Sequence, residues 1–210
     1  RHTRYWRDWS SDVCSSDLKS VLIFRHNFSH DRLSWRNKSG EFNVGVILGR
    51  RNSQSYECIK QWRDQVVEEC VNDPEAGKCG DQTYLDTWIT DYDFVQISKR
   101  KGACLAPWNL NNFKSLAFEA NQIDNHPIDF FHFHGLVILL LTSHFAIYLC
   151  APGYRIDLRG FSKIYKNYIL ALMKTKQQYC LPSTLTRPKS FLRNIRGNWQ
   201  SLKIIANLNL

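Results

Sequence analysis

The clearest pattern along the chain is an alternation of short apolar runs with polar segments. Three apolar runs predict buried strands, at residues 20–24, 42–48 and 94–97. The polar segment 25–40 predicts a loop or a broken helix. Asn52 opens a predicted helix whose apolar stripe consists of Tyr56, Ile59, Trp62, Val66, Cys70 and Val71. Strand, polar turn and helix in this order are typical of the α/β class.

A glycine followed by an acid and an amide begins the next predicted element. Gly80 precedes Asp81 and Gln82, and the apolar residues Tyr84, Leu85 and Trp88 then follow at helical spacing. The pattern predicts a short helix with Asp81 as its N-cap, where backbone N–H groups favour negative charge. Two interpretations stay open. Either Asp81 is only a cap and Gln82 a solvated neighbour, or the pair faces a ligand.

Gly45 lies inside the second predicted strand, between valines. Glycine weakens a strand, because it has no side chain to pack and loses more backbone entropy than other residues. Its presence indicates that a ligand or another backbone segment comes close at this position. A packing constraint within the sheet explains it equally well.

Residues 128–135 predict a further strand in which aromatic and imidazole side chains alternate. Phe131 and Phe133 fall on one face, and His132 and His134 on the other. Two imidazoles on one face can hold a divalent metal or a phosphate. A pair of hydrogen-bonded histidines at the end of a strand is the other interpretation.

The segment from residue 136 to 150 is strongly apolar, but polar residues interrupt it, and it is shorter than a bilayer-spanning helix. It predicts two buried strands or an interfacial segment, with a transmembrane helix as the remaining alternative. Residues 161–173 predict an amphipathic helix with lysines on its polar side. The basic residues from 187 to 203 predict a solvated tail or a contact with anionic lipid.

Three further features of the sequence add to this picture. Residues 7–18 resemble a translated sequencing adapter, so residues 1–18 are set aside as an artefactual tail, with a disordered N-terminus as the alternative. The net charge of +9 favours an anionic partner, which can be a nucleotide, a nucleic acid or a membrane surface. None of the seven cysteines forms a C-x-x-C pair, which favours a reducing cytoplasm.

Four motifs in series resemble those of a known enzyme family. They are Asn43-Val44-Gly45-Val46, Gly80-Asp81-Gln82-x-x-Leu85-Asp86, Leu105-Ala106-Pro107-Trp108-Asn109 and His132-Phe133-His134-Gly135-Leu136. Together they resemble a family of bacterial glycosyltransferases. These are nucleotide-diphospho-sugar transferases of the GT-A fold, distantly similar to the glycogenin and lipopolysaccharide galactosyltransferase group. The resemblance extends from about residue 20 to about residue 179.

The resemblance implies roles for individual residues. Asp81 and Gln82 would act in catalysis, orienting the donor sugar and stabilising the oxocarbenium-like charge that develops on it. His134, with His132 second, would hold a divalent metal (Mn²⁺ or Mg²⁺) that neutralises the leaving diphosphate. Contacts with the donor or the acceptor are implied for Asn43, Gly45, Gly80, Asp86, Trp108 and Gly135, and Asp86 stands where the distant group usually has Asn.

The chain departs from the family pattern at its N-terminal side. Members of the family have a nucleotide-binding half and an Asp-x-Asp metal motif before the Asn-x-Gly strand. Neither precedes Asn43 here, and Asp91-Tyr92-Asp93 follows the Asp-Gln pair in a predicted loop. The expected architecture is therefore α/β: the C-terminal part of a GT-A-type mixed sheet with flanking helices over residues 19–180, followed by a basic tail over 181–210.

The implied reaction moves a sugar from a nucleotide-sugar donor to a surface-glycan or lipid-linked acceptor. We expect the isolated chain to be inactive, and the location to be cytoplasmic with peripheral contact to an anionic inner membrane. The alternative is a non-enzymatic, basic protein at the membrane periphery. A nucleic-acid partner is not expected, because the basic residues lack an interleaved aromatic platform.

Overall fold

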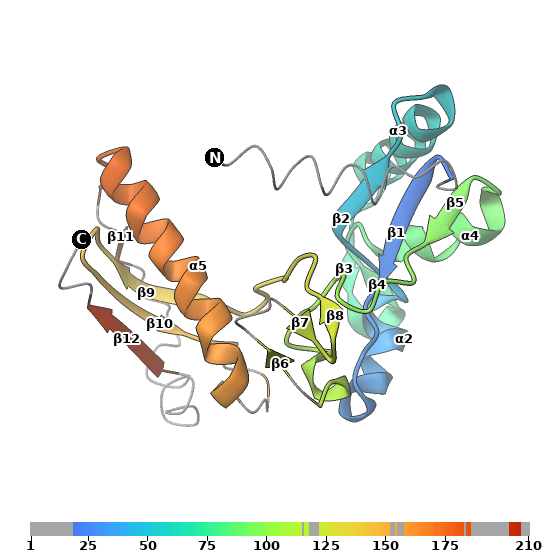
Figure 1. Cartoon of the computed structure of the whole chain (residues 1–210). Helices are drawn as coiled ribbons and strands as arrows, with labels where there is room; N and C mark the ends of the chain where they lie inside the picture. The colour runs from blue at the N-terminus through green and yellow to red at the C-terminus, as the bar shows by residue number, and fades with distance from the viewer. Residues whose placement is uncertain are drawn as a thin grey trace. The chain divides into compact units, whose positions relative to one another are not determined.

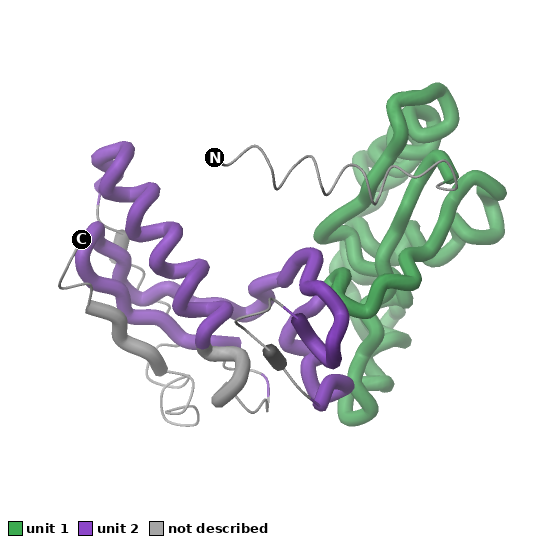
Figure 2. The backbone as a smooth tube through the Cα atoms, viewed as in Figure 1, with its two compact units in different colours: residues 1–104 green, residues 105–210 purple. Residues whose placement is uncertain are grey.

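The computed structural model is mixed α/β and divides into two compact units, residues 1–104 and residues 105–210 (Figure 2). It describes residues 19–114, 116–117, 122–151, 154, 158–182, 184–185 and 202–206. The expected artefactual tail, and most of the expected basic tail, lie outside the described residues. The division near residue 104 had no counterpart among the sequence-based expectations, which placed residues 19–180 in one domain.

Unit 1 is built on a three-stranded mixed sheet in the order β2-β1-β5 (Figure 1). β1 (Val21–Arg25) pairs antiparallel with β2 (Phe42–Gly49) and parallel with β5 (Val95–Ile97). These strands confirm the three strands predicted from the apolar runs. The register between β1 and β2 is irregular after Leu22.

Short elements connect the strands of unit 1, and one long helix follows β2. The helices are η1 (His30–Trp35), α2 (Arg36–Ser39), α3 (Ser53–Glu68), η2 (Pro74–Ala76), η3 (Thr83–Asp86) and α4 (Trp88–Asp91). A two-stranded ribbon, β3 (Asn72–Asp73) with β4 (Lys78–Cys79), precedes η3. The hydrophobic core of unit 1 consists of the buried residues Val21, Ile23, Phe42, Cys58, Leu85, Trp88 and Val95.

α3 begins as predicted but buries a different face from the one expected. Asn52 caps it, because its side chain accepts a hydrogen bond from the Ser55 N–H at 2.9 Å. The helix buries Ser55 and Cys58, whereas Tyr56 in the predicted stripe is 65% exposed. The small Ser55 side chain allows close approach to the sheet, and its hydroxyl donates to the Ser20 carbonyl oxygen at 2.6 Å. The predicted stripe was therefore wrong in part.

Unit 2 contains two small sheets and one long helix. The larger sheet has the order β11-β9-β10-β12 and the smaller the order β6-β7-β8. Their strands are β6 (Leu116–Ala117), β7 (Gln122–Ile123), β8 (His126–Pro127), β9 (Val137–Leu141), β10 (Phe145–Leu149), β11 (Thr184–Leu185) and β12 (Leu202–Ala206). The β9–β10 hairpin confirms the interpretation of segment 136–150 as two strands.

The helix α5 (Leu158–Gln178) lies along the β9–β10 hairpin and includes the predicted amphipathic helix (Figure 1). Its residues Tyr165, Ile169 and Met173 are fully buried, at helical spacing. A short 3₁₀ helix, η4 (Leu110–Asn112), begins the unit near a small core of Leu105, Leu110 and Ile123. Among the described residues, no helix combines the length and the apolar character needed to cross a bilayer.

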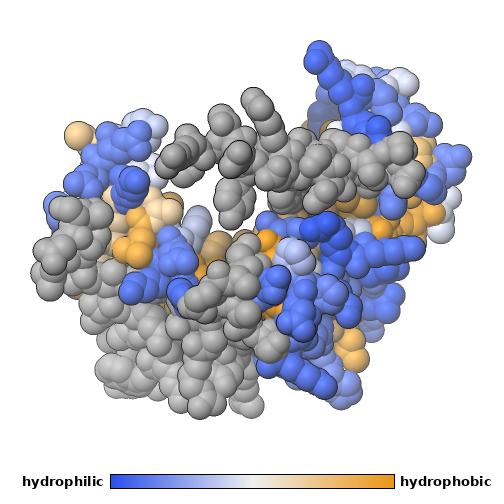
Figure 3. All heavy atoms as spheres, in the orientation of Figure 1, coloured by the Kyte–Doolittle hydropathy of each residue, from blue (hydrophilic) through white to orange (hydrophobic). Residues whose placement is uncertain are grey.

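The described surface is mostly hydrophilic on the face of unit 1 seen in Figure 3, where hydrophobic side chains form separate patches. Its most exposed large apolar residues include Tyr56 and Val67, both on α3. Single exposed apolar residues are common on protein surfaces and need no partner to explain them.

Candidate functional site

The Gly80-Asp81-Gln82 turn follows β4 directly and has a different geometry from the one predicted. Gly80 has a φ of +56°, in the left-handed region that favours glycine, and its N–H donates to the Val71 carbonyl oxygen at 3.0 Å. Gln82, not Asp81, precedes the four-residue helix η3, and no side chain caps that helix. The prediction that Asp81 is an N-cap is therefore wrong, because the helix begins one residue later than expected.

Because Asp81 does not cap a helix, its side chain is uncommitted, meaning that it is not used in a local hydrogen bond. The Trp62 indole N–H of α3 donates to the backbone oxygen of Asp81 at 2.9 Å and anchors the turn. The part of the chain that the structure describes offers the Asp81 carboxylate no hydrogen bond or ion pair. The Gln82 amide nitrogen lies 3.0 Å from the Cys79 sulfur. Both side chains are partly exposed, so a ligand can reach them.

Asn43 and Gly45 lie on β2 and bond to each other. The Asn43 side-chain oxygen accepts a hydrogen bond from the Gly45 N–H at 2.8 Å, and its amide nitrogen lies 3.3 Å from Nε2 of His26. Asn43 is only 5% exposed. Its side chain therefore holds the irregular part of β2 in shape, and the exposed Gly45 is the member of the motif that faces outward.

Asp86 holds the turn that leads into β2. Its carboxylate accepts hydrogen bonds from the backbone N–H groups of Glu41, at 2.9 Å, and Phe42. Burial raises the pKa of Asp86, with a smaller contribution from the charge of Glu41, while the two N–H groups and Arg36 act in the opposite direction. The structure thus gives Asp86 a backbone-holding role.

A single bridge brings two distant motifs of unit 2 together. Leu105 pairs in parallel with Phe131, and the His132 N–H donates to the Leu105 carbonyl oxygen at 2.7 Å. The predicted strand over residues 128–135 is reduced to this bridge. Leu105 bonds to this segment on both sides of Phe131, because its own N–H donates to the Phe130 carbonyl oxygen at 3.3 Å. Leu105 begins the loop that contains Trp108, so this pairing places Trp108 beside the histidines.

The predicted alternation of side chains is nevertheless present. Phe131 and Phe133 both contact Tyr165 of α5, with ring centroids 5.6 and 5.4 Å away. On the other side, Trp108 lies 5.1 Å from His132 and 5.4 Å from His134 between ring centroids, and the two imidazoles are 6.1 Å apart. We call Trp108, His132 and His134 the imidazole cluster.

Tyr154 completes this cluster and was missed by the sequence analysis. Its hydroxyl oxygen lies 2.6 Å from Nδ1 of His134, and its ring meets the imidazole edge-on. Gly135 fits close beside it with a φ of +72°, and a Cβ there would lie 3.6 Å from the Tyr154 ring. No periodic pattern marks Tyr154 in the sequence, so only the folded chain reveals it.

The electrostatics of the cluster favour neutral imidazoles. Burial lowers the pKa of His134, and burial together with the neighbouring His134 lowers the pKa of His132. The hydrogen bond with Tyr154 then sets what Nε2 of His134 can do. If Nδ1–H donates to the phenolic oxygen, Nε2 keeps a lone pair for a metal. If the hydroxyl donates, Nε2 carries the proton and can donate to a phosphate oxygen.

The described residues fit a divalent metal only in part. No group of three or more His, Cys, Asp or Glu side chains with metal-binding geometry occurs among them. His132 and His134 can supply two imidazole nitrogens, whereas Mg²⁺ prefers oxygen ligands. The missing ligands would have to be oxygens from a bound diphosphate or from carboxylates elsewhere. Asp81 and Gln82 belong to unit 1 and the histidines to unit 2, so their convergence on one ligand stays a prediction.

Comparison with known proteins gives relatives without an assigned activity. The chain is similar to the uncharacterized protein YfnD of Bacillus subtilis (strain 168), with 32% identity over 174 residues, covering 81% of this chain and 55% of YfnD. It is also similar to the uncharacterized protein YfnF of the same strain, with 30% identity over 107 residues, covering 50% of this chain and 35% of YfnF.

These comparisons limit what can be transferred from a relative. No model of a protein family matches the chain, and no solved structure matches it. The chain spans about half the length of YfnD and about a third of YfnF. The activity of a whole protein of this kind is therefore a matter for proposal.

Proposed function

We propose that the chain is the sugar- and acceptor-binding part of a nucleotide-diphospho-sugar glycosyltransferase with a GT-A-type fold. The observation that carries the proposal is the imidazole cluster. Two motifs about 25 residues apart in sequence are brought together, so that the partly buried imidazole of His132 and the exposed imidazole of His134 both lie against one tryptophan. The mixed sheet β2-β1-β5, with its two parallel strands, is compatible with this fold class.

The chemistry assigns a part to each group. The bond between the sugar C1 and the diphosphate oxygen breaks, a bond from C1 to an acceptor hydroxyl oxygen forms, and the hydroxyl proton passes to the leaving diphosphate or to solvent. The uncommitted Asp81 carboxylate stabilises positive charge at C1, and the Gln82 amide orients the sugar. Nε2 of His134 faces the diphosphate, with Tyr154 fixing the imidazole. A bound Mn²⁺ or Mg²⁺ would supply charge neutralisation of the diphosphate.

The alternative, a non-enzymatic protein at the membrane periphery, has less support. It would use the apolar segment 136–150 and the basic C-terminal tail to contact the lipid interface. Segment 136–150 instead forms the β9–β10 hairpin, in which Leu139, Tyr148 and Leu149 are buried. The exposed lysines of α5, among them Lys163 and Lys166, form an ordinary solvated surface.

Donor turnover tests the proposal. The chain is completed to the length of its relatives, and release of nucleotide diphosphate is measured over a panel of nucleotide sugars. We expect Gln82→Ala and His134→Ala to lower turnover by about 10²- to 10³-fold while the unfolding midpoint stays unchanged. Lys166→Gln, on the solvated side of α5, serves as the control. Absence of turnover with every donor, combined with unchanged binding of anionic vesicles by all variants, would favour the membrane-peripheral alternative.

A further inference from the structure

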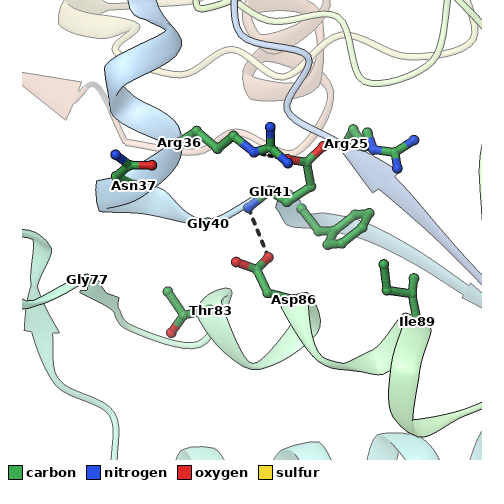
Figure 4. A pocket seen from close by; sticks show the side chains of 10 residues that line it. Arg25, Arg36, Asn37, Gly40, Glu41, Gly77, Thr83, Asp86 and Ile89 are labelled. Carbon is green, nitrogen blue, oxygen red and sulfur yellow. Dashed lines mark hydrogen bonds and ion pairs between the residues drawn. The ribbon is translucent and has the colours of Figure 1, made fainter.

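A pocket of about 510 Å³ lies within unit 1, between the turn from α2 into β2 and the η3–α4 segment (Figure 4). Its volume is in the range of small-ligand sites. The charged side chains that line it are Arg25, Arg36, Glu41 and Asp86. Neither Asp81 nor Gln82 lines the pocket, so its use does not depend on the proposed transfer reaction.

The two arginines are held by one carboxylate. Nε of Arg25 lies 2.8 Å from one oxygen of Glu41, and Nε of Arg36 contacts the other oxygen. Figure 4 shows the two guanidinium groups on either side of the Glu41 carboxylate. Within the described part of the chain, no residue other than Glu41 forms an ion pair with Arg25 or Arg36. The terminal nitrogens beyond each Nε therefore remain for a ligand.

The two arginines of this pocket are more exposed to solvent than the carboxylate that pairs with them. The side chains of Arg25 and Arg36 are 42% and 63% exposed, whereas that of Glu41 is 22% exposed. Within the group of Arg25, Arg36 and Glu41, two guanidinium groups share one carboxylate, so this group carries a net positive charge. Arginine presents its N–H donors as a planar fork that matches the two oxygens of a carboxylate or a phosphate.

Asp86 is the feature of the pocket that opposes anion binding. Its carboxylate, however, is directed at the backbone N–H groups of Glu41 and Phe42 and not at the guanidinium groups. The hydroxyl of Thr83 and the amide of Asn37 add neutral donors to the lining.

We propose that this pocket of unit 1 binds an oxyanion, the phosphate or carboxylate group of a ligand, between the guanidinium groups of Arg25 and Arg36. Glu41 sets the spacing and orientation of the two arginines in advance, so little side-chain entropy is lost on binding. The ligand class is thus a phosphorylated or a carboxylated small molecule, such as an acidic sugar.

Calorimetric titration of the full chain at low ionic strength tests the proposal. The probes are inorganic phosphate, glucuronate and, as the neutral counterpart, glucose. We expect phosphate or glucuronate to bind, and Arg25→Gln and Arg36→Gln to weaken that binding by roughly 10- to 100-fold. Tighter binding of phosphate identifies a phosphorylated ligand, and tighter binding of glucuronate a carboxylated one. Glucose should bind neither to the wild type nor to the variants.

Lys38→Gln is the matched control. Lys38 lies on α2 together with Arg36, but it pairs with Glu75 and does not line the pocket. It should leave binding unchanged. Circular dichroism checks that each variant is folded. If the glutamine variants unfold, Arg36→Lys keeps the charge without the fork and should bind several-fold more weakly than the wild type. The proposal is overturned if neither oxyanion binds, or if Lys38→Gln weakens binding as much as the arginine variants do.

Discussion

The two units use their candidate side chains in opposite ways. In unit 1, Asn43 and Asp86 accept hydrogen bonds from nearby backbone N–H groups and so maintain the local fold. In unit 2, Trp108, His132 and His134 contact one another through their rings, and their backbone is held by a separate bridge at Leu105. A polar residue in a motif can therefore be structural or chemical, and the atoms it bonds distinguish the two cases.

The largest effect that sharpens this comparison is expected at Gly40, in the turn held by Asp86. Gly40 has a φ of +80° and a ψ of 173°, and a Cβ there would lie 3.0 Å from a carboxylate oxygen of Asp86. Gly40→Ala should lower the free energy of unfolding by about 3 kcal/mol in urea denaturation. Gly77→Ala, also left-handed but with its nearest atom 3.6 Å away, should cost only about 1 kcal/mol. Equal costs would show that Asp86 does not constrain the turn.

Asp86 bonds the backbone and Asp81 does not, so we expect replacement by alanine to affect stability differently at the two positions. Asp86→Ala leaves two backbone N–H groups at the start of β2 without their acceptor, and we expect a loss of about 2 kcal/mol in the free energy of unfolding. Asp81→Ala should change it by less than about 0.5 kcal/mol. The distinction between the two aspartates fails if urea denaturation gives the reverse order.

Two tyrosines of unit 2 provide a matched pair. Tyr154→Phe removes the hydroxyl that bonds His134 and should cost about 1 kcal/mol. The hydroxyl of Tyr165 is buried and has no hydrogen-bond partner among the described residues, and burial raises its pKa. Tyr165→Phe should therefore leave thermal stability unchanged or raise it slightly. A loss of stability in Tyr165→Phe similar to that in Tyr154→Phe would contradict this assignment.

The smallest expected effect is a difference in pH dependence. The lowered pKa values of His132 and His134 mean that the unfolded chain takes up protons first as pH falls. Their contribution to stability is complete above the unfolded pKa of about 6.5 and is lost as the pH falls from there through the lowered folded pKa. Asp86 acts in the opposite sense. Its contribution is present below the unfolded pKa of 3.8 and is lost as pH rises through the raised folded value.

Unfolding midpoints measured from about pH 7.5 to about pH 5.5 check the histidine effect. The midpoint of the wild type should decline over this range, and the double variant His132→Gln with His134→Gln should decline less. The same slope in both proteins would mean that these histidines titrate alike in the folded and unfolded chains.

The sequence was sufficient to locate secondary structure where a local pattern of residues determines it. Apolar runs located β1, β2, β5 and the β9–β10 hairpin, and the Asn52 cap located the start of α3. Alternation along residues 131–134 correctly separated the phenylalanines from the histidines, although no regular strand forms there.

Features that depend on distant contacts could not be predicted in this way. The buried face of α3 is set by how closely Ser55 approaches the sheet, and the geometry of Asp81 by the Gly80 turn and the Trp62 indole. The partnership of Tyr154 with His134, and that of Arg25 and Arg36 with Glu41, joins segments with no shared local pattern. Propensity and periodicity carry no information about such pairs.

The central proposal is that Asp81 and Gln82 of unit 1 and His134 of unit 2 serve one transition state. A double-mutant cycle on donor turnover in the completed chain tests it most directly, with Gln82→Ala, His134→Ala and the two combined. Removing either group slows the same chemical step, so both single variants should lower turnover and the double variant should lose no more than the product of the two losses. Wild-type turnover in a folded Gln82→Ala or His134→Ala variant would contradict the proposal.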